Sequence, residues 1–221
     1  MDHRRGPLVS ARPRKLVQLA SRDNFALHTT VARVAPVVEA SMTAEVLADR
    51  VLDQRHLSDD GSGWLAPWRP ARRVFDSRLR ELAGQSVVLR TDVKDCFGSI
   101  TPVVVESALV RVGCHPGEST AVGSVLSRLS EQGVRGLPVG PPASTVLANA
   151  VLVGVDRSLR GRPHLRWVDD ILVFCVDMKE AFRTLSRLRR ELATVGLQIA
   201  PEKTSVGALV GGISDSSSMS R

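Results

Sequence analysis

Two adjacent aspartates, Asp169 and Asp170, have the residue types and the surroundings best suited to chemistry. They separate the apolar stretches Leu-Arg-Trp-Val and Ile-Leu-Val-Phe, which have the composition of buried strands. Burying two neighbouring carboxylates is costly unless a cation compensates them. The pattern therefore predicts a β-hairpin whose tip offers oxygen ligands to Mg²⁺. Aspartate is also a common turn residue, so a hairpin turn with two exposed acids is the alternative.

A third carboxylate, Asp92, follows the β-rich run at residues 87–91. If this strand lies next to the hairpin, Asp92 and Asp169 would be close enough to hold two divalent ions about 4 Å apart. Such a pair activates an attacking oxygen and stabilises a leaving one during phosphoryl transfer. Asp95, slightly later, is expected to be a solvent-facing turn residue.

The elements that must position these acids follow from hydrophobic spacing and from cap residues. Apolar residues recur at helical intervals over 24–57, where Pro36 is expected to kink or split the helix. Asp177 and Glu180 have the spacing of a capping box. This order predicts an α+β fold, an antiparallel sheet with helices on one face. Further helices are expected over 102–113, 116–132, from Ser144 onward and 177–195, and strands over 87–93, 165–176 as a hairpin, 197–200 and 206–210.

Composition narrows the class of protein. The chain has 221 residues, which suits one large domain or a domain with an appendage. Its 30 basic and 23 acidic residues give a net charge of +7, which indicates an anionic partner or a solvated basic face. Three scattered cysteines favour neither zinc nor disulfides. With no apolar stretch long enough to span a membrane and no secretory signal, the expectation is a cytoplasmic protein without membrane contact.

A glycine- and proline-rich loop at 136–142 precedes a predicted helix. Glycine allows a close approach to a ligand, and helix N-termini attract phosphates. Such a loop is equally typical of a simple connection. It lacks the Gly-Lys-Ser/Thr ending of a phosphate-binding P-loop and the glycine spacing of a dinucleotide-binding fold.

Four segments in this order resemble the reverse transcriptase family. The segment RTDVKDCFGSI at 90–100 is similar to the first palm motif, and GLPVGPPASTVLANAVL at 136–152 is similar to the second. LRWVDDILVF at 165–174 is similar to the Tyr-x-Asp-Asp hairpin, and GLQIAPEKTSVG at 196–207 to the Gly-Leu and Lys-Thr segment that follows it. The resemblance covers residues 87–210 and implies a polymerase palm with a reduced, mostly helical fingers region.

The resemblance also implies roles for single residues. Asp92, Asp169 and Asp170, with the backbone carbonyl of Val93, would bind two Mg²⁺ ions, for which Mn²⁺ could substitute. Lys203 has the position of a lysine that protonates the departing pyrophosphate, and is otherwise a surface lysine.

Nucleotide and nucleic-acid contacts are implied in the same way. Phe97 has the position of the steric gate that discourages a ribose 2′-hydroxyl, and is otherwise a core aromatic residue. Asn149 would hold the second-motif helix or be an ordinary helix residue. The residues implied to touch the nucleotide are Val93, Phe97, Pro138, Val139 and Gly140, and those implied to bind nucleic acid are Arg14, Lys15, Arg69, Arg72 and Arg73.

The chain also departs from the family pattern. Val139 replaces the usual glutamine of the second motif, and Trp167 replaces the tyrosine of the hairpin. The expected division is a basic arm with helical fingers at 1–86, a palm at 87–213 and a disordered tail at 214–221. A helical thumb is expected to be missing or supplied by a separate thumb-like or accessory protein. The form of the second motif is similar to divergent bacterial reverse transcriptases, some of which act in antiviral (phage) defence.

The resulting hypothesis is RNA-templated DNA synthesis from dNTPs on a DNA or RNA primer. The partners would be an RNA template, the primer and dNTPs. Two alternatives stay open at this point. One is a catalytically lapsed palm that serves as an RNA-binding scaffold, and the other is a template-independent nucleotidyl transferase.

Overall fold

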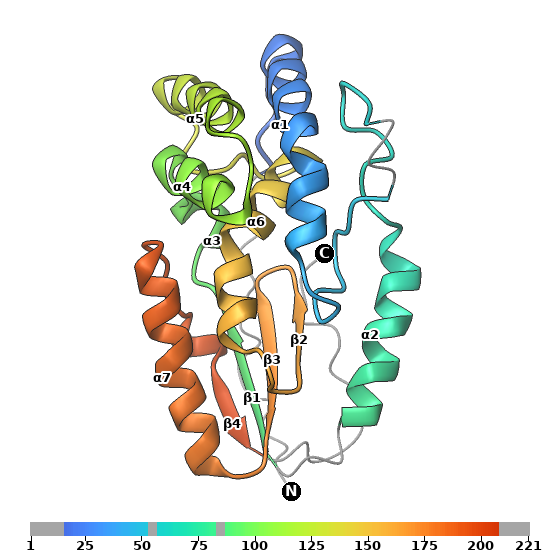
Figure 1. Ribbon diagram of the computed structural model, residues 1–221, viewed down its shortest axis with the longest axis vertical. Helices are drawn as coiled ribbons and strands as arrows, with labels where there is room; N and C mark the ends of the chain where they lie inside the picture. Colours follow the sequence, from blue (N-terminus) through green and yellow to red (C-terminus); the bar gives the residue numbers. More distant parts are fainter. Residues whose placement is uncertain (1–15, 53–56, 83–86, 208–221) are drawn as a thin grey trace, which may run out of the picture.

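The computed structural model describes residues 16–52, 57–82 and 87–207. Its helices and strands form a sheet with helices around it and a helical bundle at one end (Figure 1). No helix in these ranges is both long and apolar enough to cross a membrane. In chain order the elements are α1 (Ser21–Ser41), α2 (Trp68–Leu82), β1 (Val87–Asp92), α3 (Cys96–Ser99), α4 (Pro102–Val112), α5 (Pro116–Glu131), α6 (Pro142–Ser158), β2 (His164–Trp167), β3 (Asp170–Cys175), α7 (Met178–Thr194), the 3₁₀ turn η1 (Pro201–Lys203) and β4 (Ser205–Gly207).

The sheet has four strands in the order β2-β3-β1-β4, and every pairing is antiparallel. Strand β1 lies between β3 and β4, although both follow it by many residues in the chain. The expected α+β class is confirmed, and so is the expectation that the strand ending in Asp92 lies next to the hairpin.

The two faces of the sheet are covered differently. Because side chains alternate along a strand, Leu89 of β1 and Val173 of β3 share one face, the helix face, which packs against α6 and α7. Val88 and Phe174 share the other face with Asp92 and Asp170, and we call it the carboxylate face. Helix α2 packs part of this second face, so the helices are not confined to one side as expected. The α2 residues in this contact are Phe75 and Leu79, against Leu165, Trp167, Leu172 and Phe174 of β2 and β3.

Helix α1 ends at Ser41, whereas the sequence predicts a helical pattern that continues to residue 57. The buried carboxylate of Glu39 accepts hydrogen bonds from Arg50 Nε at 2.6 Å and from the Val51 amide at 3.0 Å. The same guanidinium donates to the carbonyls of Thr43 and Val46, which a longer helix would use for its own ladder. Hydrogen bonds from side chains therefore replace the backbone hydrogen bonds of a helix after Ser41. Pro36 lies inside α1 and does not end it.

Other element boundaries follow the sequence closely, with local exceptions. Helix α6 begins at Pro142, so Ser144 lies buried in its first turn and is not its N-cap. Asp177 caps α7 by accepting from the Glu180 amide at 2.7 Å, as predicted, and the Glu180 carboxylate accepts from the Val176 amide. Of the expected strand at 197–200 only a bridge between Val93 and Ile199 forms. The tail at 214–221 and residues 208–210 of the last expected strand lie outside the described ranges.

Candidate active site

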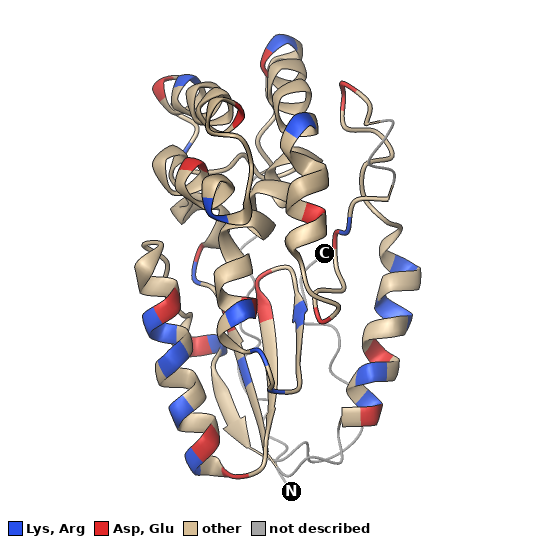
Figure 2. Ribbon diagram, viewed as in Figure 1, with Lys and Arg blue, Asp and Glu red and all other residues tan. Residues whose placement is uncertain are grey.

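Three aspartates gather where β1 ends and the β2–β3 hairpin turns. Asp92 and Asp170 are direct register partners across the β1–β3 pairing, and Asp169 precedes Asp170 in the turn. Their exposed fractions are 4%, 9% and 7% for Asp92, Asp170 and Asp169. Burial of this degree is incompatible with the alternative of two exposed acids in a turn. Figure 2 shows the acidic tip of the hairpin close to the end of β1.

The hairpin turn holds its acids in a strained backbone conformation. Val168 has a φ of 56°, which is costly for a β-branched residue. Arg166 Nη1 donates to the Val168 carbonyl at 2.8 Å, and the Val93 amide donates to the Asp169 carbonyl at 3.3 Å. Two hydrogen bonds from different strands therefore fix the peptide groups on either side of the turn.

Arg166 is the centre of a buried polar network that the sequence did not reveal. Its side chain is fully buried and makes two 2.8 Å hydrogen bonds to the Asp156 carboxylate, from Nε and Nη2. Arg166 Nη1 also donates to Asn149 Oδ1 at 2.9 Å. Both partners lie on α6 beneath the sheet, so the guanidinium connects that helix to the turn of the β2–β3 hairpin. Two features of the sequence could have indicated this network: Arg166 lies inside an apolar strand, and Asp156 lies inside an apolar helix.

The predicted alternative for Asn149, that it holds the second-motif helix, agrees with this network. Its amide nitrogen also lies 3.5 Å from the carbonyl of Asp49, in the segment after α1. Asn149 thus contacts both the hairpin arginine and the segment that follows α1.

The electrostatics of the cluster reflect three like charges in a partly dry site. Burial, followed by the negative charges of Asp92 and Asp169, raises the pKa of Asp170 to about 6. Lys203 Nζ donates to Asp92 Oδ2 at 2.9 Å. Burial alone lowers the pKa of Lys203, but this hydrogen bond and the charges of the three aspartates outweigh it and raise the pKa. Lys203 therefore lies beside the predicted metal ligands, within hydrogen-bond distance of one of them.

The first-motif turn and the second-motif loop are packed against one another. The Phe97 carbonyl accepts from the Leu137 amide at 2.8 Å. Gly136 has a φ of 64°, and a Cβ there would lie 2.3 Å from that same carbonyl, so only glycine fits. Phe97 itself is half-buried, beside the core that α3 and α6 share. The loop is therefore held by the turn that also carries the predicted gate residue.

The remaining loop residues that were predicted to touch a nucleotide lie together. Pro138 is buried, Val139 is half-buried and Gly140 is exposed. The Val139 carbonyl accepts from the Val17 amide at 2.9 Å, so the segment before α1 runs along this loop. The predicted nucleic-acid residues Arg14 and Lys15 lie outside the described ranges.

Three arginines predicted to bind nucleic acid lie on or near α2, and their surroundings differ. Arg72 stacks over the rings of Phe75 and Trp167 and pairs with Asp76 at 2.9 Å. Arg69 lies over the ring of Trp68, and Arg73 is exposed. The ring of Trp167, which replaces the expected tyrosine, is therefore covered by Phe75 and Arg72.

The carboxylates of the three aspartates suit a cation that is already bound to the phosphates of a substrate. Within the described ranges no group of three or more His, Cys, Asp or Glu side chains is arranged so that it could hold a metal ion. Mg²⁺ in nucleotide-dependent sites is commonly held by one or two carboxylates together with substrate phosphates. Hard carboxylate oxygens, and the repulsion from Asp92 and Asp169 that helps to raise the pKa of Asp170, fit that mode of binding.

Comparison with known proteins assigns the family. A family model described as reverse transcriptase (RNA-dependent DNA polymerase) matches residues 38–215, which is most of the chain. The chain belongs to this reverse transcriptase family. The resemblance of the four sequence segments is thereby confirmed, and the palm-type arrangement of sheet and helices agrees with it.

Individual relatives of this reverse transcriptase are distant. Retron Mx65 reverse transcriptase from Myxococcus xanthus is 29% identical over an alignment of 142 residues that covers 56% of this chain and 33% of that protein. Retron Mx162 reverse transcriptase from the same organism is 27% identical over an alignment of 152 residues that covers 56% of this chain and 31% of that protein. Apo telomerase from Candida tropicalis, truncated from its C-terminal domain, has a TM-score of 0.47 at 11% identity, covering 84% of this chain and 41% of that one. The chain spans about one third of the length of the curated relatives it matches.

Proposed function

We propose that this chain catalyses RNA-templated DNA synthesis, in which a primer 3′-hydroxyl attacks the α-phosphate of a dNTP. The observation that supports this most directly is the register pairing of Asp92 with Asp170, with Asp169 beside them, on a buried part of the carboxylate face. Burying three carboxylates side by side is costly to a fold that does not use them, and burial together with the charges of Asp92 and Asp169 raises the pKa of Asp170.

The metal is part of the proposal. Two Mg²⁺ ions held by Asp92, Asp169 and Asp170, with the Val93 carbonyl, would supply Lewis-acid activation of the attacking hydroxyl and charge neutralisation of the leaving group. Mn²⁺ could take the same positions.

The chain's own residues position the reactants and move one proton. Arg166 and the Val93 amide hold the hairpin turn, and this keeps the Asp169 and Asp170 carboxylates in place. Lys203, 2.9 Å from Asp92, is proposed to donate its proton from Nζ to the departing pyrophosphate. Its raised pKa keeps the amine protonated before the reaction.

Selection of the nucleotide is proposed to involve the packed pair of motifs. Phe97, with Gly136 and Leu137 against its backbone, would form the floor on which the sugar rests, and Pro138, Val139 and Gly140 would flank the nucleotide. Arg69, Arg72 and Arg73 on the α2 side are proposed to follow the template backbone. A role in phage defence is part of the proposal and is supported only by the resemblance to divergent bacterial enzymes.

The test measures incorporation of labelled dNTPs with Mg²⁺ on an RNA template annealed to a DNA primer. We expect Asp169→Ala to lower the rate at least about 10³-fold, because several kcal/mol of charge stabilisation is lost. Asp59→Ala is the matched control, since Asp59 is an exposed aspartate in the segment between α1 and α2 and is not one of the three clustered aspartates. Circular dichroism shows whether both variants are folded.

The same experiment separates the alternatives. Equal incorporation without any template would assign the chain to template-independent nucleotidyl transfer. RNA binding by the unmodified chain without any incorporation would favour a scaffold, and normal synthesis by Asp169→Ala would refute the role of the acids.

A further inference from the structure

A second charged surface lies on α7, on the opposite side of the sheet from the aspartates. Helix α7 has five basic and two acidic residues. Lys179, Arg183, Arg187 and Arg190 recur at intervals of four, four and three residues, so they form one stripe along the helix. At 1.5 Å per residue this stripe is about 16 Å long. Figure 2 shows the blue bands of this stripe along the outer side of α7.

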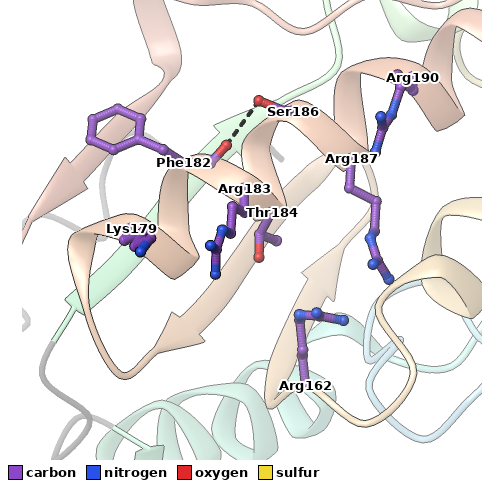
Figure 3. Close-up of a pocket in the computed structure, with 8 residues that line it drawn as sticks. All are labelled: Arg162, Lys179, Phe182, Arg183, Thr184, Ser186, Arg187 and Arg190. Atoms are coloured by element: carbon purple, nitrogen blue, oxygen red, sulfur yellow. Dashed lines mark hydrogen bonds between the residues drawn. The ribbon is translucent and has the colours of Figure 1, made fainter.

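The stripe forms one wall of a groove of about 690 Å³. Arg162, from the turn after α6, lies on the other side, and the side chain of Arg187 points toward it (Figure 3). Arg187 Nη1 donates to the Ser158 carbonyl at 3.1 Å, which anchors α7 to the C-terminal end of α6. The residues that line this α7 groove are Arg162, Lys179, Phe182, Arg183, Thr184, Ser186, Arg187 and Arg190.

The positive charge of the groove is almost uncompensated. No acidic residue lines it, and the nearest acid contact is a 3.7 Å ion pair between Arg162 and Glu180. For the part of the chain that the structure describes, no carboxylate lies within 4 Å of the charged groups of Lys179, Arg183 or Arg190. Cations that pair with no carboxylate of the described residues are available to an anionic ligand.

The groove is separate from the carboxylate face. The opposite side of α7, with Ala181, Leu185 and Leu188, packs in the core with Leu89 and Val173 of the helix face. Asp92 and Asp170 point to the other face of the same strands. A ligand in the α7 groove is therefore separated from the aspartates by the thickness of the sheet.

We propose that the α7 groove binds the phosphodiester backbone of a nucleic acid outside the catalytic face. A linear stripe of cations suits a polymer with one charge at every short interval along its strand. Guanidinium groups form bidentate hydrogen bonds with phosphate, and four of the five cations in the groove are arginines. Phe182 also lines the groove and is 54% exposed, so its ring offers a surface on which a base can stack. The inference does not depend on the proposed polymerase activity.

The experiment measures binding of fluorescein-labelled single-stranded RNA, and of DNA with the same sequence, to the full chain without metal or dNTPs. We expect Arg183→Glu/Arg190→Glu to raise the Kd about tenfold, because two phosphate contacts become repulsive. The slope of log K against log salt should fall by about 1.4, that is about 0.7 for each lost contact with a single strand. If the variant loses equal affinity for RNA and DNA, the groove binds either nucleic acid. If it loses affinity for RNA alone, the ligand of the groove is RNA.

The matched control is Arg22→Glu/Arg33→Glu, which makes the same charge change at two exposed arginines of α1. An equal loss of affinity in this control, or an unchanged Kd and salt slope in the α7 variant, would overturn the proposal. Displacement of the RNA by poly-glutamate at equal charge concentration would also overturn it, in favour of an acidic protein partner.

Two further measurements address misfolding and location. Arg183→Gln/Arg190→Gln removes charge without reversing it and should show a smaller change in the same direction. Photo-crosslinking with 4-thiouridine RNA, followed by peptide mapping, should give adducts in the 179–190 peptide. Adducts found exclusively outside this peptide would contradict the proposal.

Discussion

The carboxylate face of the sheet and the outward side of α7 carry opposite charges in opposite physical states. On the carboxylate face, three aspartates are less than a tenth exposed and are positioned by hydrogen bonds to their backbone or side chains. On the far side of α7, the basic side chains are mostly exposed and solvated. Burial of charge costs folding free energy, whereas exposed charge costs little. Substitutions on the carboxylate side should therefore change both stability and chemistry, and substitutions in the α7 groove should change mainly salt-sensitive binding.

The largest stability effect is expected beneath the carboxylate face, at Arg166. Arg166→Leu leaves Asp156 as a buried, unpaired carboxylate, which should lower the free energy of unfolding by about 3–5 kcal/mol. Urea denaturation measures the loss. Arg183→Leu, an exposed arginine of α7, is the comparison and should change stability by less than about 0.5 kcal/mol.

A double variant sharpens this contrast. Arg166→Leu/Asp156→Leu removes both charges, so it should recover much of the lost stability while primer extension stays impaired, because the Val168 carbonyl still loses its donor. A single variant as stable as the unmodified chain would show that the buried pair does not hold the turn.

The next effect depends on pH and concerns Asp170. Its pKa is raised to about 6 from an ordinary value of 3.8, so the folded state binds this proton more tightly than the unfolded state. The stability associated with this group is therefore present below about pH 4 and is lost as pH rises through about 6. In metal-free buffer, Asp170→Asn should exceed the unmodified chain by up to about 3 kcal/mol at pH 8 and equal it near pH 4.

Chemical denaturation at several pH values measures this difference. Asp59→Asn, at an exposed aspartate, should follow the unmodified chain throughout. A constant difference for Asp170→Asn at every pH would show that its effect is unrelated to titration.

A smaller effect is expected for sugar selection. Phe97→Ala should increase the use of ribonucleotides relative to deoxyribonucleotides about tenfold or more, since packing alone discriminates a single small group by that order. Single-nucleotide incorporation with matched dNTP and rNTP measures the ratio. An unchanged ratio with a lowered rate would reduce Phe97 to a core residue that supports the Leu137 loop.

The smallest effect is expected on α2. Arg72→Ala should lower the free energy of unfolding by about 1 kcal/mol, because its guanidinium stacks on Phe75 and Trp167. Arg73→Ala, one residue further along the same helix and exposed, should be close to neutral. Thermal unfolding compares the two, and equal effects would mean that the stacking contributes nothing measurable.

Local patterns predicted most of the elements around the site. Helices α4 and α5 lie almost where their apolar spacing and their proline and glycine boundaries place them, and Asp177 caps α7 as its spacing predicts. These features depend on interactions within a few residues. The extent of α1 was predicted poorly, because the bonds that end it come from Arg50 and Val51, which the periodicity of the segment does not reveal.

The sequence by itself determined which residues could do chemistry: the order of the four motifs, the paired acids and the family to which the chain belongs. Only the tertiary structure decided how those residues meet. Register pairing put Asp92 opposite Asp170, packing of α6 under the sheet gave Arg166 its buried partners, and folding of α7 onto the helix face turned its cations outward as a second surface. The reason is physical: motifs and helix periodicity are encoded over short stretches of chain, whereas burial, like-charge repulsion and ion pairing depend on segments that are distant in sequence and adjacent only after folding.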